Sequence, residues 1–214
     1  YALAQPTHPS LFELCNVVVG MKPYQVGKGV PKQDRNTVEN RIFDAEQKID
    51  KSYRKLLRGS DINKYENNWD SKRWIKFGEW LAEPRLSANF DAKEKIVIRQ
   101  TGDSLISTLD INQFVCMNNL HVLSIKSNTL NLKYILALIN SKLLNFYFQY
   151  LNPETGEALA EVKKETVEKL LIKKTKEQSP FIKLVDYVLI IKKSNRIIAL
   201  FFERIIDAMV YGVH

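Results

Sequence analysis

The distribution of apolar residues along the first 130 positions is mostly that of β-strands. Val17, Val18 and Val19 form a short apolar run. In residues 96–100, Ile96, Ile98 and Gln100 alternate with Val97 and Arg99, the period of two that strands show. Turn signals at residues 102–103 and 110–112 favour an antiparallel meander in this region. The predicted strands are residues 17–19 and 96–100, with further strand candidates at 105–109 and 114–126.

The rest of the chain has helical periodicity. Asn131 is expected to cap a helix in which Leu132, Ile135, Leu136 and Ile139 share one face. A second helical stretch follows residue 141. Its aromatic residues recur at helical spacing, which predicts that they belong to the core: Phe146, Tyr147 and Tyr150.

The last forty residues carry two further apolar periodicities. Ser179 followed by Pro180 resembles a helix start, with Ser179 as the N-cap. Residues 181–191 and 198–209 each place apolar residues on one face, and both segments are apolar over more than one stripe. Such helices must pack against something, which is the preceding domain, each other or another subunit.

These patterns predict an α+β protein with a twisted, mixed, mainly antiparallel sheet and flanking helices, followed by two C-terminal helices. The expected divisions are a linker at 1–9, a main domain at 10–176 and a helical appendage at 177–214. The chain does not begin with methionine, and we expect it to be a piece of a longer polypeptide.

Composition adds a bias towards polyanionic partners. The 214 residues carry 32 Lys and Arg against 24 Asp and Glu, a formal net charge of +8, which favours a phosphate-rich partner. Cys15 and Cys116 are far apart and in apolar settings, so buried free thiols and a cytoplasmic location are expected. The most apolar run, residues 188–191, is far too short to span a bilayer.

Residues 53–102 interleave cations with planar rings. All three tryptophans, Trp69, Trp74 and Trp80, lie there together with several arginines, a composition that suits a surface meeting nucleic acid. Large rings also dominate core burial, and packing is the favoured reading for the tryptophans.

Catalytic signatures do not accompany this segment. The chain has no Pro-Pro pair of the kind an amine methyltransferase uses, no glycine-rich cofactor turn and no phosphate-binding loop. Four Asp/Glu-x-Lys pairs fit the minimal pattern of a metal nuclease, but their number in so lysine-rich a chain makes the pattern uninformative. They begin at Glu46, Asp70, Asp91 and Glu161. Neither a metal site nor a cofactor site is expected, and His121 is expected to be a half-buried structural residue.

Four blocks of sequence follow one another in a characteristic order: LLRGSDI at 56–62, WIKFG with its continuation WLA and PR at 74–85, KIVIRQ at 95–100 and YILALINS at 134–141. Together they resemble the TaqI-like C-terminal specificity domain, the target recognition domain of type IIG restriction-modification enzymes and related adenine methyltransferases, similar to type I specificity subunits. The resemblance covers roughly residues 12–175. It implies sequence-specific recognition of double-stranded DNA, with S-adenosylmethionine and Mg²⁺ used only by methyltransferase and nuclease domains outside this chain.

The basic loop that follows the first strand, together with cations near the family blocks, supplies the predicted DNA contacts. They are Lys22, Tyr24, Lys28, Lys32, Arg35, Arg58, Lys72, Arg73, Arg99 and Asn118. Some have structural alternatives: Lys72 and Arg73 as a solvated face, Arg58 as a partner of Asp61, and Arg99 as a paired sheet residue. Two competing functions stay open, an assembly module whose helices bind a methyltransferase or second specificity unit, and a metal-dependent nuclease.

Overall fold

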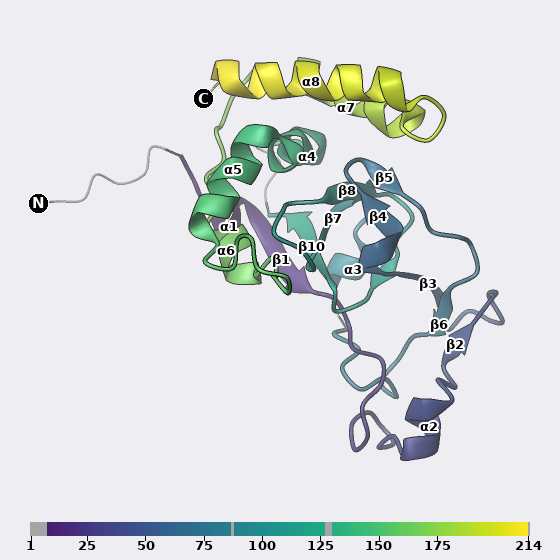
Figure 1. The fold of residues 1–214 in the computed structure, drawn as a ribbon. Coiled ribbons are helices and arrows are strands. Elements are labelled where there is room, and N and C mark those ends of the chain that lie inside the picture. Colours follow the sequence, from purple (N-terminus) through teal and green to yellow (C-terminus); the bar gives the residue numbers. More distant parts are fainter. Residues whose placement is uncertain (1–7, 87, 127–129, 214) are drawn as a thin grey trace, which may run out of the picture.

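The computed structural model describes residues 8–86, 88–126 and 130–213 and places a four-stranded antiparallel sheet at its centre (Figure 1). The strands run in the order β1-β10-β7-β8. Their bounds are β1 Cys15–Val19, β7 Lys95–Arg99, β8 Ser107–Asp110 and β10 Leu120–Ile125. The register pairs Val17 with Leu123 and Val122 with Val97.

Alternate side chains of the central strands enter two different cores. Ile96, Ile98 and Leu123 join the larger core beneath the helices, whereas Val97 and Val122 join a second core on the other face. Because both faces are covered, these strands have apolar residues at consecutive positions instead of alternating with polar ones.

A second, smaller sheet covers that other face. Its order is β2-β6-β3-β9, and the β3–β9 pair is parallel while its other pairs are antiparallel. The bounds are β2 Asp44–Ala45, β3 Tyr53–Leu57, β6 Trp74–Lys76 and β9 Val115–Cys116, with a separate ribbon of β4 Ile62–Asn63 and β5 Glu66–Asn67 and a 3₁₀ turn at Gly59–Asp61. The mainly antiparallel α+β class is confirmed. The expected meander is interrupted, because Val115–Cys116 leaves it to pair with β3.

Helices cover the opposite side of the central sheet. α4 packs on β7 and β8, and it begins where expected, with Asn131 Oδ1 accepting a hydrogen bond from Lys133 N at 2.8 Å. The helical bounds are α1 Leu11–Leu14, α2 Arg35–Glu39, α3 Ala88–Asp91, α4 Leu132–Asn140, α5 Lys142–Leu151, α6 Lys164–Glu168, α7 Ser179–Ile191 and α8 Arg196–Val213.

Two helical predictions need correction. Phe146 and Tyr150 are 70% and 81% exposed, because α5 lies at the surface and buries only its Leu144, Asn145 and Phe148 side. α7 starts one residue earlier than expected, with Gln178 at the N-cap position and Ser179 already inside the helix.

The C-terminal helices share the larger core. Phe181, Val185 and Val188 of α7 are buried with the α4 side chains, and the Phe181 ring meets the Tyr134 ring edge-on at 5.1 Å. Figure 1 shows α7 and α8 across one end of the molecule and α2 at the opposite end. Residues 1–7, most of the predicted linker, lie outside the described residues.

Candidate nucleic-acid interface

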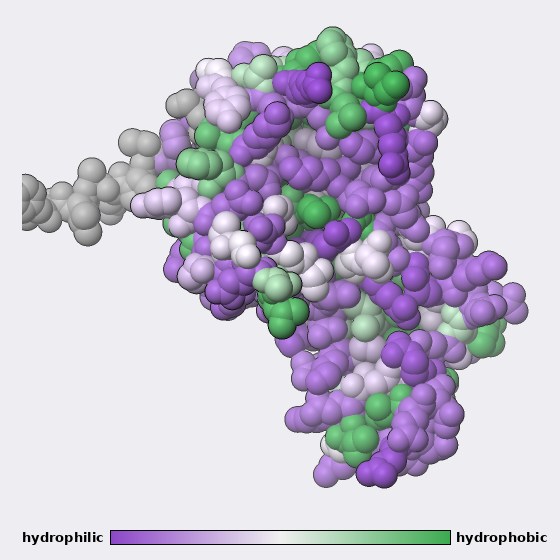
Figure 2. Space-filling model, in the orientation of Figure 1, coloured by the Kyte–Doolittle hydropathy of each residue, from purple (hydrophilic) through white to green (hydrophobic). Residues whose placement is uncertain are grey.

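Two segments of the chain have a strong excess of positive charge, and one of them, residues 163–176, holds six Lys against two Glu. The other, residues 22–58, called the basic segment below, holds ten Lys and Arg against five Asp and Glu, a net +5 of the +8 of the whole chain. Much of the segment lies at the α2 end, and Figure 2 shows that end as mostly hydrophilic on the visible face. A local excess of this size attracts a polyanion to that end of the molecule.

Three of the predicted contacts lie on this segment with exposed side chains: Lys28, Lys32 and Arg35. Lys28 and Lys32 belong to a loop that precedes α2, and Arg35 is the first residue of α2. Lys22 is half-buried, and its Nζ donates to Gln25 Oε1 at 2.8 Å. Its backbone pairs with Glu83, so Lys22 anchors the start of the loop.

The Tyr24 side chain is hydrogen-bonded and stacked within the protein. Its hydroxyl donates to Asp44 Oδ1 at 2.9 Å and accepts from Phe43 N at 3.0 Å, while its ring stacks on Phe43. Arg41 closes the unit: its Nε donates to Asp44 Oδ2 at 2.8 Å and its guanidinium lies over the Tyr24 ring. Burial, followed by the Asp44 charge, raises the pKa of the Tyr24 hydroxyl. Tyr24 thus ties the loop to β2.

The tryptophans are half-buried and pack on other rings and on lysines. Trp69 meets Trp74 at 5.7 Å and Phe114 at 5.1 Å, both edge-on. Lys55 Nζ lies 5.6 Å from the Trp69 ring centre. Trp80 has Phe43 on one side at 6.4 Å and Lys76 over its ring at 5.1 Å. The interleaving of cations and rings in the sequence therefore corresponds to cation–π packing inside the protein.

Three more predicted contacts meet at a depression of about 240 Å³ between β2, β3 and β6, namely Arg58, Lys72 and Arg73. Arg73 is committed to structure, because its terminal nitrogen bonds Asp61 Oδ1 at 2.6 Å and lies 3.5 Å from Asp70. The partner of Asp61 is therefore the Arg73 side chain, while Arg58 contributes its backbone N–H at 2.8 Å. Lys72 is exposed.

Of the last two predicted contacts, Arg99 is bonded within the protein and Asn118 is exposed. The Arg99 guanidinium donates from Nε to Gly59 O at 2.9 Å and from a terminal nitrogen to Ile62 O, so it holds the 3₁₀ turn. Asn118 is exposed at the turn between β9 and β10.

Sequence reasoning missed the residue that organises the basic loop. Gln33 is 4% exposed and its amide bonds three backbone groups of the loop and its surroundings. It also missed Arg41 and the exposed lysines Lys48 and Lys51. Local charge density was the available signal for the lysines; Gln33 gave none, because its partners lie 8, 10 and 47 residues away, beyond its local sequence.

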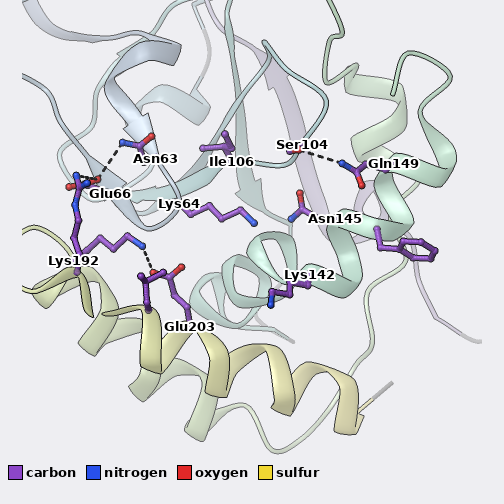
Figure 3. Close-up of a pocket in the computed structure, with 13 residues that line it drawn as sticks. Asn63, Lys64, Glu66, Ser104, Ile106, Lys142, Asn145, Gln149, Lys192 and Glu203 are labelled. Atoms are coloured by element: carbon purple, nitrogen blue, oxygen red, sulfur yellow. Dashed lines mark hydrogen bonds and ion pairs between the residues drawn. The ribbon is translucent and has the colours of Figure 1, made fainter. Parts of the chain in front are cut away.

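A second hollow, of about 720 Å³, lies between α5, α8 and the β4–β5 ribbon (Figure 3). Lys64 lines it, and burial lowers the pKa of its amine, which donates to Asn140 O at 2.9 Å. Lys192 is paired with Glu203, and Arg196 lies 4.0 Å from Glu66. Since two of the cations there, Lys192 and Arg196, face carboxylates of the same hollow, it suits a polyanion less well than the basic segment does.

The carboxylates of the minimal nuclease pattern are dispersed. Asp70 lies beside Arg73, and Asp91 pairs with Arg54 at 2.8 Å. In the part of the chain that the structure describes, no group of three or more His, Cys, Asp or Glu side chains is placed to hold a metal ion. The thiols are buried and free, as predicted, and burial raises the pKa of Cys15 and of Cys116 to about 12.

His121 is more deeply buried than expected. Its side chain is 1% exposed, and Nε2 lies 2.6 Å from Val162 O. Across the described ranges, no helix has the length and apolarity needed to cross a membrane.

The comparisons with known proteins now identify the class. The model of the TaqI-like C-terminal specificity domain matches residues 54–172, more than half of the chain, and the chain belongs to this family. None of the curated proteins compared with the sequence matches it.

Solved structures share the fold. The S subunit of a type I restriction-modification system from M. genitalium has a TM-score of 0.51 and 14% identity, over 89% of this chain and 41% of that one. The type IIL restriction-modification enzyme MmeI in complex with DNA has a TM-score of 0.57 and 13% identity, over 98% of this chain and 34% of that one. This chain therefore spans less than half the length of either protein.

Proposed function

We propose that this specificity domain recognises a DNA sequence in duplex form and delivers that duplex to an adenine methyltransferase domain outside the chain. Family membership supports the specificity role. The structure of MmeI, which shares the fold, is a complex with DNA. S-adenosylmethionine, and Mg²⁺ where a nuclease is attached, would serve those other domains in the cytoplasm.

The observation that carries the proposal is the net +5 of the basic segment, presented on a loop and helix at one end of the fold. Exposed amines release counterions when they meet phosphates, and this release supplies much of the affinity of DNA-binding proteins. Lys28, Lys32 and Arg35 are the best-placed phosphate contacts, because their side chains are exposed. Lys72 and Asn118 are exposed as well, whereas Tyr24, Arg73 and Arg99 act by shaping the surface.

The proposal is tested by replacing Lys28 and Lys32 together with Gln. We expect weaker binding to all duplexes alike, because phosphate contacts carry no sequence information. The matched control replaces Lys183 and Lys193, two exposed lysines of the α7 region, and removes the same charge. An equal loss of duplex affinity in both double variants would show that the effect comes from net charge alone. A loss confined to one DNA sequence would contradict the phosphate role.

A second candidate, assembly with another protein of the restriction-modification system, is favoured by a specific surface. Tyr187, Ile190, Ile197 and Phe201 on α7 and α8 are 56%, 76%, 82% and 59% exposed. Deletion of these helices is a poor test, since α7 also fills the core. Replacing Ile190 and Phe201 with Gln would abolish co-purification with the methyltransferase subunit and leave duplex binding unchanged; retained co-purification would count against this role.

A further inference from the structure

Five hydrogen bonds converge on Gln33. Its Nε2 donates to Pro23 O and to Trp80 O, both at 2.8 Å, and its Oε1 accepts from Gln25 N at 3.0 Å. Its backbone N–H donates to Lys28 O at 2.8 Å, and its carbonyl accepts from Gly27 N at 2.9 Å. The amide's two N–H donors are both used, as expected for a polar side chain that is 4% exposed.

The loop that Gln33 holds contains two glycines in the left-handed region and lies close against the Trp80 segment. Gly27 and Gly29 adopt positive φ values of +80° and +88°, which glycine reaches without steric cost. A Cβ on Gly29 would come within 2.4 Å of Trp80 O, so the loop backbone lies directly against the Trp80 segment. Val30 N also donates to Glu79 O at 2.9 Å.

Lys28 and Lys32 lie on the part of the loop that these bonds hold. Lys28 accepts from the Gln33 backbone, and Lys32 precedes Gln33 in the chain. A glycine-containing loop that is ordered only on binding loses conformational entropy at that moment, and a loop ordered beforehand does not.

We infer that Gln33 is a positioning residue for DNA binding: its buried amide fixes the loop so that Lys28 and Lys32 meet the DNA backbone without further ordering. The inference rests on the proposed function, and it assigns to Gln33 no contact with DNA.

The test is a double-mutant cycle on the full chain, read by fluorescence anisotropy with a mixed-sequence duplex. Gln33→Met keeps the length and removes all three side-chain bonds. We expect it to weaken binding about tenfold when Lys28 and Lys32 are present, from the cost of ordering about one residue. With both lysines already replaced by Gln, the same change should alter the affinity less than twofold. Gln113→Met, in an exposed loop where Nε2 bonds Asp91 O, is the matched control and should bind as the parent does.

Equal factors in the two lysine backgrounds would overturn the inference, since a general loss of folding would act in both. If the variant fails to fold, hydrogen exchange on the unmodified chain still tests the inference. The Gly27 and Gln33 amides should be protected in the free protein and gain little on adding the duplex; protection that arises only with DNA overturns the inference. Should the lysine pair itself prove irrelevant to binding, the proposed function fails instead.

Discussion

Replacement of Arg99 separates a base-reading role from a structural one. A guanine-reading arginine would relax the preference at one base position by about 1–3 kcal/mol when lost. In the structure, however, its guanidinium is half-buried and bonded to the carbonyls of Gly59 and Ile62. The turn between these carbonyls contains Asp61, the partner of Arg73.

The cost follows from those contacts. Hydrogen bonds from a charged group contribute roughly 1.5–3 kcal/mol each, and partial exposure places both near the lower end, so Arg99→Ala should lose about 3 kcal/mol of unfolding free energy. For a chain of this size that corresponds to a melting temperature lower by about 6–12 °C.

The assay combines thermal unfolding with binding to a panel of duplexes that differ at single base pairs. We expect the lower melting temperature together with an unchanged order of preference among the duplexes. Arg204→Ala, on the exposed side of α8, is the control and should change stability by less than about 0.5 kcal/mol. A variant that melts like the parent but loses discrimination at one base position would contradict the structural role of Arg99 and support a base-reading one.

Two further predictions concern buried ionisable groups. Lys95 and Asp110 form an ion pair at 2.6 Å with both side chains fully buried. Lys95→Met should therefore lower the free energy of unfolding, measured in urea, by about 3–5 kcal/mol, whereas Lys93→Met, at an exposed position, should not. Equal stabilities of the two variants would contradict this. Burial lowers the pKa of His121 below its ordinary 6.5, so the unfolded state takes up the proton first. The free energy of unfolding is therefore unaffected by the titration of His121 above pH 6.5 and decreases as the pH falls below 6.5, by at most about 1.4 kcal/mol per pH unit. His121→Asn should flatten this part of the stability profile. A parent and variant whose stability difference is independent of pH would show that His121 does not titrate this way.

Features set by neighbouring residues were predictable from the sequence. The strand pattern at residues 96–100 and the cap at Asn131 depend on side chains within a few positions, and they appear in β7 and α4. Phe146 and Tyr150 had helical spacing too, but spacing identifies a face and cannot tell whether another element covers it.

Features set by distant contacts were not predictable. Val115 pairs with Leu56 in parallel, and Gln33 bonds Trp80, 47 residues away. For the cations, the sequence gives charge but not partner, so it could not distinguish exposed Lys28 from Arg73, which is held by Asp61.

The role of the basic segment as a phosphate-binding surface can be measured from the salt dependence of duplex binding. Each phosphate contact contributes about −0.9 to the slope of log K against log salt concentration. We expect a steep slope for the parent chain that becomes shallower by about 2 when Lys28 and Lys32 are replaced by Gln, and by much less when Lys183 and Lys193 are replaced. No duplex binding at low salt, or an unchanged slope in the Lys28 and Lys32 variant, would contradict it.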